Sequence, residues 1–249
     1  MEVSKHDPGT FCWIELATSD RKAAVKFYGD LFGWTAREFP MDDGNVYVIG
    51  LKKGKDAAGI YETKDAPPNW LSYVCVTSAD EAAAKAKKLG GHLMMDAFDV
   101  MDIGRMAMII DPQVAPFAVW QPKKHIGVGI MNEHGTLGWN ELQATDPDAA
   151  RKFYTSLFGW GAKVSPEYTE WTIGGRSIGG MMKSQAPGAP SHWLVYFVVD
   201  DCDASTKKAQ SLGARTHVPP MDIANVGRFS VVADPQGAFF AMIKMTSPM

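Results

Sequence analysis

The chain contains the same stretch of sequence twice. Residues 13–34 and residues 139–160 are identical at 13 of 22 aligned positions, at a constant offset of 126. Further matching positions follow at an offset of 123, among them Trp70 with Trp193. Agreement over this length at nearly fixed spacing indicates an internal duplication, because unrelated segments do not reach it by chance. The 249-residue chain is therefore expected to fold as two similar halves.

Each copy of the repeat is predicted to form a strand, a tight turn and a helix. Asp20 and Asp146 precede the helices as N-caps, since an aspartate side chain accepts hydrogen bonds from backbone N–H groups of the first turn. Apolar residues then recur at helical spacing, and the helices are expected to end at Gly33 and Gly159. Three short strand-like runs follow each helix, so the repeated unit has the order βαβββ.

A second βαβββ unit completes each half. In the first half it comprises a strand near 70–77, a helix near 79–89 and three further strands. Residues 122–136 contain one proline and three glycines, and they form the predicted connection between the halves. The predicted fold class is therefore α+β, with a first domain over 11–121, a linker over 122–136 and a second domain over 137–244.

Composition narrows the range of partners and compartments. The formal net charge of −3 and the scattered lysines and arginines provide no basic surface for nucleic acid. No apolar run is long enough to span a membrane, and the first nine residues are too polar for a secretion signal. Cys12, Cys75 and Cys202 lack metal-binding spacing and are expected to be buried thiols. These features predict a cytoplasmic protein without nucleic-acid or membrane partners.

Several short motifs resemble those of the vicinal oxygen chelate superfamily, which includes glyoxalase I, bleomycin-resistance proteins and extradiol dioxygenases. They are the helix pattern Ala-x-x-Phe-Tyr followed by Leu-Phe-Gly-Trp, and the Asp-Pro-Gln turn before the last strand of each half. The Trp-x-Glu-Leu opening and the linker sequence at His125 resemble more narrowly the two-domain glyoxalase-like proteins of actinobacteria. The resemblance implies tandem domains, each with a cupped mixed sheet and helices outside.

The resemblance also implies where a metal would be held, and the sequence departs from the family there. Members usually take ligands from the first, fifth and eighth strands of a domain. The equivalent positions are Trp13, Leu71 and Ala118 in the first half, and Trp139, Leu194 and Ala241 in the second. None of these side chains coordinates a divalent metal, so no cofactor is predicted. A non-standard metal site, such as His192 with Glu141, is left as an alternative.

Side-chain alternation along the strands predicts what faces the inside of each sheet, here called the first and the second cup. If Ile14 and Leu16 pack under the helix, Trp13 and Glu15 point into the first cup. The same parity turns Trp139 and Glu141 into the second cup, although it also places the polar Asn140 under a helix. The predicted ligand-binding residues are Trp13, Tyr73, Trp120, Trp139, Tyr196, His192, Arg105 and Arg228.

Glu15 and Glu141 are the candidate catalytic residues, and two interpretations of them remain open. A carboxylate in an aromatic cup can be an anchor or general base whose pKa is raised by apolar surroundings. It can equally be structural, because a buried acid must be paired with hydrogen-bond donors. Arg105 and Arg228 can reach the cup rims to bind an anion, or form salt bridges there.

Two functions of different class follow from these observations. The first is a binding protein that holds a small aromatic or apolar molecule in a cup without a metal. The second is a lyase, isomerase or dioxygenase of the same superfamily, which uses Glu15 and Glu141 as acid–base groups or a metal at a non-standard site. Because one chain already supplies a pair of domains, a monomer is expected, with a homodimer as the alternative.

Overall fold

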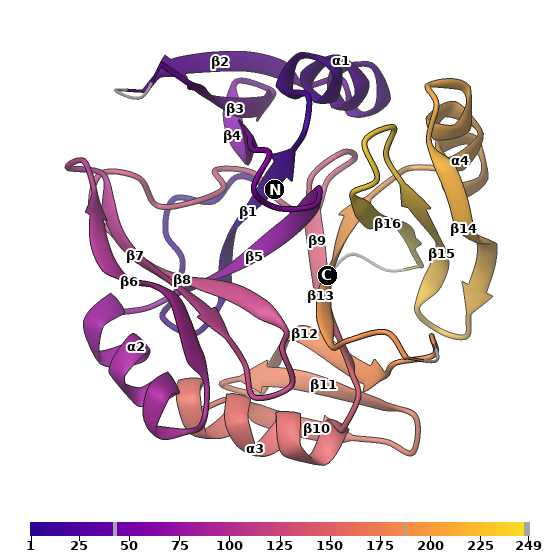
Figure 1. The fold of residues 1–249 in the computed structure, drawn as a ribbon. Helices are drawn as coiled ribbons and strands as arrows, with labels where there is room; N and C mark the ends of the chain where they lie inside the picture. The colour runs from indigo at the N-terminus through magenta and orange to yellow at the C-terminus, as the bar shows by residue number, and fades with distance from the viewer. Residues whose placement is uncertain (42–43, 187, 247–249) are drawn as a thin grey trace.

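The computed structural model describes residues 1–41, 44–186 and 188–246. Within these residues the order βαβββ occurs four times, twice in each half (Figure 1). The first half comprises β1 (Phe11–Thr18), α1 (Arg21–Phe32), β2 (Thr35–Pro40), β3 (Val46–Lys52), β4 (Lys55–Glu62), β5 (Asn69–Cys75), α2 (Ala79–Lys88), β6 (His92–Val100), β7 (Gly104–Ile110) and β8 (Pro116–Pro122). The second half comprises β9 (Leu137–Ala144), α3 (Pro147–Phe158), β10 (Gly161–Val164), β11 (Tyr168–Ile173), β12 (Arg176–Lys183), β13 (His192–Val198), α4 (Cys202–Ser211), β14 (Arg215–Ile223), β15 (Gly227–Ala233) and β16 (Phe239–Met245).

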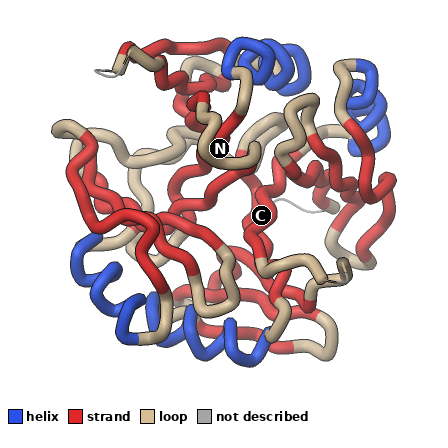
Figure 2. The backbone as a smooth tube through the Cα atoms, viewed as in Figure 1, coloured by secondary structure: helices blue, strands red, loops and turns tan. Residues whose placement is uncertain are grey.

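Each half forms one mixed sheet of eight strands. The strand orders are β2-β3-β4-β1-β5-β8-β7-β6 and β10-β11-β12-β9-β13-β16-β15-β14. The first strand of each half pairs in parallel with the fourth and antiparallel with the fifth. Figure 2 shows the helices at the outside of the molecule. The tandem, cupped α+β fold expected from the sequence is therefore confirmed.

The predicted helix caps explain where the repeated helices begin and end. The side chain of Asp20 accepts a hydrogen bond from the backbone N–H of Ala23, and Asp146 caps α3 in the same way. The backbone N–H groups of Gly33 and Gly159 close the last turns. These local contacts set the angle at which each helix returns over its sheet.

The hydrophobic cores join units from different halves. In one core, α1 packs with β13, α4 and β16, and in the other, α2 packs with α3 and β9. Figure 1 accordingly places α1 near α4 at one end of the molecule and α2 near α3 at the other. Each sheet thus follows the sequence of one half, whereas each core is completed by the other half.

The repeated motifs supply the buried polar contacts of these cores. The Tyr28 hydroxyl donates to Oδ2 of Asp234 at 2.9 Å, and the Tyr154 hydroxyl donates to Oδ2 of Asp111 at 3.0 Å. Each tyrosine of the Phe-Tyr motif is therefore bonded to the Asp-Pro-Gln turn of the opposite half. Since both tyrosines are fully buried, these contacts lie within the cores and hold the two halves in register.

Two further expectations concern buried polar groups and thiols. Asn140, the polar misfit in the strand parity, accepts a hydrogen bond at 2.6 Å from the Ser72 hydroxyl between the two sheets, so the Ser72 hydroxyl and the Asn140 carbonyl oxygen are paired although both residues are buried. Cys12, Cys75 and Cys202 are buried free thiols, as expected. Among the described residues, no helix is long and apolar enough to cross a membrane.

Candidate functional site

The first cup holds Glu15 between two phenol groups. The Tyr47 hydroxyl donates to Oε2 of Glu15 at 2.6 Å, and the Tyr73 hydroxyl donates to Oε1 at 2.8 Å. The indole Nε1 of Trp13 donates to the Tyr47 hydroxyl at 3.3 Å. Trp13 and Glu15 therefore share the inner face, as strand parity predicts, and both belong to one hydrogen-bonded group.

The second cup repeats this arrangement around Glu141. The Tyr168 and Tyr196 hydroxyls donate to its two carboxylate oxygens, each at 2.8 Å. Trp139 donates to the Tyr168 hydroxyl at 2.9 Å. A third donor is present here, because Nε2 of Gln143 lies 2.6 Å from Oε1 of Glu141. The duplication has therefore preserved a tyrosine–glutamate–tyrosine arrangement in both cups.

Sequence reasoning missed Tyr47 on β3 and Tyr168 on β11. Each of these tyrosines lies on the third strand of its half. Their phenol rings lie over Gly59 and Gly180, which pair with Glu15 and Glu141 across the parallel strands. A Cβ at either glycine would lie 2.0 Å from the phenol oxygen, so only glycine leaves room for the ring. A glycine in the fourth strand with a tyrosine twelve residues earlier was the available signal.

Burial determines the protonation states of the glutamate and the two tyrosines in each cup. It raises the pKa of Glu15 and Glu141 above the ordinary glutamate value, and the phenol hydrogen bonds oppose that rise in part. Burial and the nearby carboxylate also raise the pKa values of the tyrosines. The phenols therefore keep their protons and act as donors, which fixes the orientation of each carboxylate.

The linker crosses the first cup and fills its aromatic end. We call residues 122–131 the strap. The His125 ring lies edge-on to Trp13 and Trp120, with ring centroids 4.8 and 5.9 Å apart respectively. Its carbonyl oxygen accepts a hydrogen bond at 2.9 Å from Nε1 of Trp120. Trp13 and Trp120 are each only 5% exposed, so neither indole is open to a ligand.

Backbone contacts hold the strap in place. The Val128 N–H donates to the carbonyl oxygen of Cys12 at 2.7 Å, and the Gly129 N–H donates to that of Asp56 at 2.8 Å. Gly127 allows this close approach, since it has a φ of +110° and its Cβ would lie 2.0 Å from the Cys12 carbonyl oxygen. The carbonyl oxygen of Val128 also lies 2.9 Å from Nε2 of His6.

The second cup has no such covering among the described residues. Trp139, the equivalent of Trp13, is partly exposed, and so is Phe229 on β15. Phe239 shares the inner face with Ala241 and Ile243 by strand alternation, and it is 46% exposed. The indole of Trp139 is therefore more accessible than that of its equivalent Trp13.

The other predicted site residues fall into two groups. Tyr73 and Tyr196 bind the glutamates, and His192 lies opposite Gln143 at the edge of the second cup. Neither Arg105 nor Arg228 contacts a cup glutamate. Arg105 pairs with Asp80 and Asp99, and Arg228 pairs with Asp203 and Asp222. Because aspartates already hold both guanidinium groups, rim salt bridges account for these arginines.

The residues at the family's metal positions do not fit a metal. Their side chains are two indoles, two leucine chains and two methyl groups, none of which donates a lone pair to a cation. They are Trp13, Leu71, Ala118, Trp139, Leu194 and Ala241, and all lie on the inner faces. In the described part of the chain, no group of three or more His, Cys, Asp or Glu side chains is placed to hold a metal.

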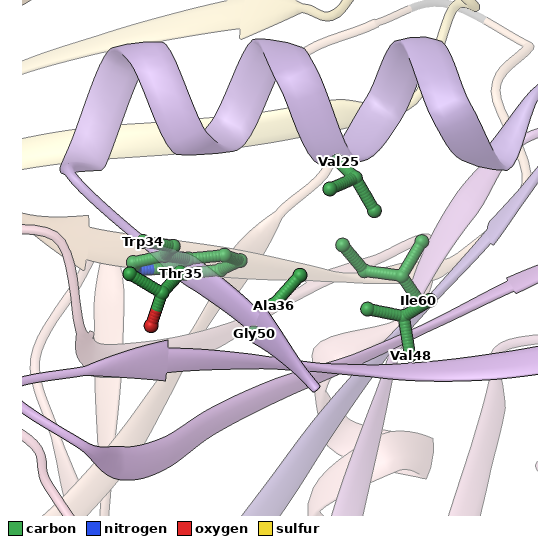
Figure 3. Close-up of a pocket in the computed structure, with 7 residues that line it drawn as sticks. All are labelled: Val25, Trp34, Thr35, Ala36, Val48, Gly50 and Ile60. Atoms are coloured by element: carbon green, nitrogen blue, oxygen red, sulfur yellow. The ribbon is translucent and has the colours of Figure 1, made fainter. Parts of the chain in front are cut away.

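A small hollow under α1 does not form a candidate site (Figure 3). It lies between the helix and strands β2, β3 and β4, and its lining has no titratable side chain. The lining residues are Val25, Trp34, Thr35, Ala36, Val48, Gly50 and Ile60.

Comparison with known proteins agrees with this architecture. The profile of the Glyoxalase/Bleomycin resistance protein/Dioxygenase superfamily matches residues 136–242. CFP32 of Mycobacterium tuberculosis, a candidate glyoxylase by name, is 40% identical over 252 residues, which cover 97% of each chain. The chain therefore belongs to the glyoxalase, bleomycin-resistance and dioxygenase superfamily.

Two further matches extend over nearly the whole chain. The anthracycline biosynthesis protein DnrV of Streptomyces peucetius is 31% identical over 268 residues, covering 98% of this chain and 96% of DnrV. The Mn(II)-bound glyoxalase of Novosphingobium aromaticivorans superposes with a TM-score of 0.70 at 14% identity, covering 97% of this chain and 84% of that chain. At that identity the superposition supports the fold alone.

Proposed function

We propose that the protein binds one small, flat aromatic molecule in the second cup and uses no metal at the family's usual position. The observation that carries this proposal is the difference between the cups. The strap fills the aromatic end of the first cup, whereas Trp139, Phe229 and Phe239 offer accessible ring surface in the second. Flat ligands gain dispersion and stacking contacts from such a surface.

Binding fits the glutamates better than general-base catalysis does. A general base needs a free lone pair within reach of the proton that it removes. The Glu141 carboxylate already accepts hydrogen bonds from Tyr168, Tyr196 and Gln143, and it is 5% exposed. These bonds favour a role in orienting the surrounding tyrosines. The name of DnrV refers to anthracycline biosynthesis, and the aromatic lining of the second cup suits a polycyclic molecule.

The proposal is tested by titrating the protein with 2-naphthylmethanol in a calorimeter. We expect one site per chain. Phe239→Ser should lower the affinity by about three- to tenfold, which corresponds to the loss of one aromatic contact. Phe39→Ser is the matched control, because Phe39 is similarly exposed at 38% but lies on the edge strand β2. Absence of binding, or equal effects of the two variants, would contradict the proposal.

A further inference from the structure

The two cups differ at one polar position beside the glutamate. Gln143 in β9 has Ala17 as its counterpart in β1, at the offset of the repeat. Gln143 donates to Oε1 of Glu141 at 2.6 Å, and Glu141 is 5% exposed. Glu15 is partly exposed, and the hydrogen bonds recorded for its carboxylate in the described structure come from its two tyrosines. Ala17 has no hydrogen-bond donor in its side chain at the position equivalent to Gln143.

We infer that Gln143 shields the charge of Glu141 from the second cup and makes this cup prefer a neutral ligand over a cation of the same shape. The inference rests on the proposed function, and it deepens that function by naming a specificity residue. The amide of Gln143 already occupies Oε1 of Glu141, so a ligand donor directed at that oxygen must compete with it. The amide has no net charge, whereas hydrogen bonds to a bare carboxylate are the stronger, charge-assisted kind.

His192 lies at the same edge of the cup as Gln143. Nδ1 of His192 lies 3.0 Å from the carbonyl oxygen of Pro190. A carbonyl oxygen only accepts, so Nδ1 is the donor of this contact. His192 and Gln143 are direct partners across β9 and β13. The amide oxygen of Gln143 is the uncharged acceptor that this edge offers to a ligand hydroxyl group, and the assigned ligand class is a neutral aromatic alcohol or phenol.

The test compares two probes that differ in charge alone, 2-naphthylmethanol and 2-naphthylmethylammonium, titrated by calorimetry at pH 7.5. The wild-type protein should bind the alcohol more tightly. Gln143→Ala, which copies the residue of the first cup, should raise the affinity for the ammonium probe about tenfold or more, since a hydrogen bond to a charged group is worth about 1.5–3 kcal/mol. The affinity for the alcohol should change by less than about threefold.

Two variants serve as controls. Adding Glu141→Gln to Gln143→Ala should abolish the gain for the ammonium probe, because the uncovered charge is then absent. Ala17→Gln alters the equivalent position of the first cup and should leave both affinities unchanged. Thermal unfolding of each variant verifies that it is folded at the temperature of the titration.

The outcomes separate the inference from the proposed function. If the wild-type protein binds neither probe, the proposed function fails and the inference fails with it. If the probes bind but Gln143→Ala changes both affinities equally, the inference is wrong while the binding function stands. A gain for the ammonium probe that survives Glu141→Gln would also overturn the inference, because the charge would then come from another group.

Discussion

Each cup glutamate is held by phenol groups from strands on both sides of its own. Tyr168 comes from β11 and Tyr196 from β13, while Glu141 itself lies on β9 between them. Tyr196 is buried and Tyr168 is partly buried, so the cup surrounds most of this hydrogen-bonded group. The carboxylate thus links three strands that are distant along the sequence.

This arrangement predicts a pH-dependent stability difference for Glu141→Gln. Burial raises the pKa of Glu141 in the folded state above its ordinary value of 4.5. Such a group contributes stability below its unfolded pKa, and the contribution is lost as the pH rises through the folded pKa. The stability of the variant relative to wild type should therefore increase between pH 4 and pH 7.

Urea unfolding at several pH values measures that difference. The other carboxyl groups with raised pKa values, Glu15, Asp111 and Asp234, are present in both proteins, so their contributions cancel. A stability difference that stays constant over this range would show that Glu141 titrates alike in the folded and unfolded states.

At the scale of elements, we expect the strap to open and close over the first cup without unfolding of the whole protein. The strap also contacts His6, which precedes β1, is 8% exposed and is hydrogen-bonded to the carbonyl oxygen of Val128. Burial lowers the pKa of His6, and that hydrogen bond opposes the shift. A histidine with a lowered folded pKa contributes stability above its unfolded pKa and loses it as the pH falls through the folded value.

The strap is therefore expected to open more often in acid. Hydrogen-exchange protection at the amides of Val128 and Gly129 should fall as the pH is lowered from 7 to 5, after correction for the intrinsic exchange rate. His6→Gln keeps a side-chain donor but cannot be protonated in this range, so it should remove the pH dependence. Amides at the β9–β13 pairing provide the internal reference, and an equal loss there would instead indicate global unfolding.

The elements differ in how much of their placement could be predicted from the sequence. The strands, helices and caps could be predicted because their periodicity and capping residues are local. Strand parity also placed Glu15 and Glu141 on the inner faces. The position of the strap could not be predicted, since His125 and Val128 dock through backbone contacts and no periodic pattern. Tyr47 and Tyr168 were missed because the parallel pairing that brings them to the glutamates is non-local.

At the scale of the whole molecule, the two cross-half tyrosines should contribute independently to stability. Tyr28→Phe removes the donor to Asp234 and the acceptor for Nε1 of Trp70. The loss should cost about 1–3 kcal/mol, the usual range for leaving buried polar groups unpaired. Tyr154→Phe has the same effect on Asp111 and Trp193 in the other core.

The double variant provides the sharper measurement. Because the two tyrosines lie in separate cores, the two losses of unfolding free energy should add to within about 0.5 kcal/mol. Urea denaturation of the wild type, both single variants and the double variant completes the cycle. A coupling energy well above that limit would show that each substitution changes the effect of the other on the free energy of unfolding.

The sharing of each core between the halves also bears on the history of the chain. A copy of a duplicated segment is dispensable only while the other copy can fold without it. Here α1 is covered by β13 and β16, and α3 by α2 and β8, so deleting either half would leave apolar helix and sheet faces in water. The duplication can no longer be reversed by loss of one copy. Under the proposed function, the duplication leaves one chain with two unequal copies of a cup: the first, whose aromatic end the strap fills, would be structural, and the second would hold the ligand.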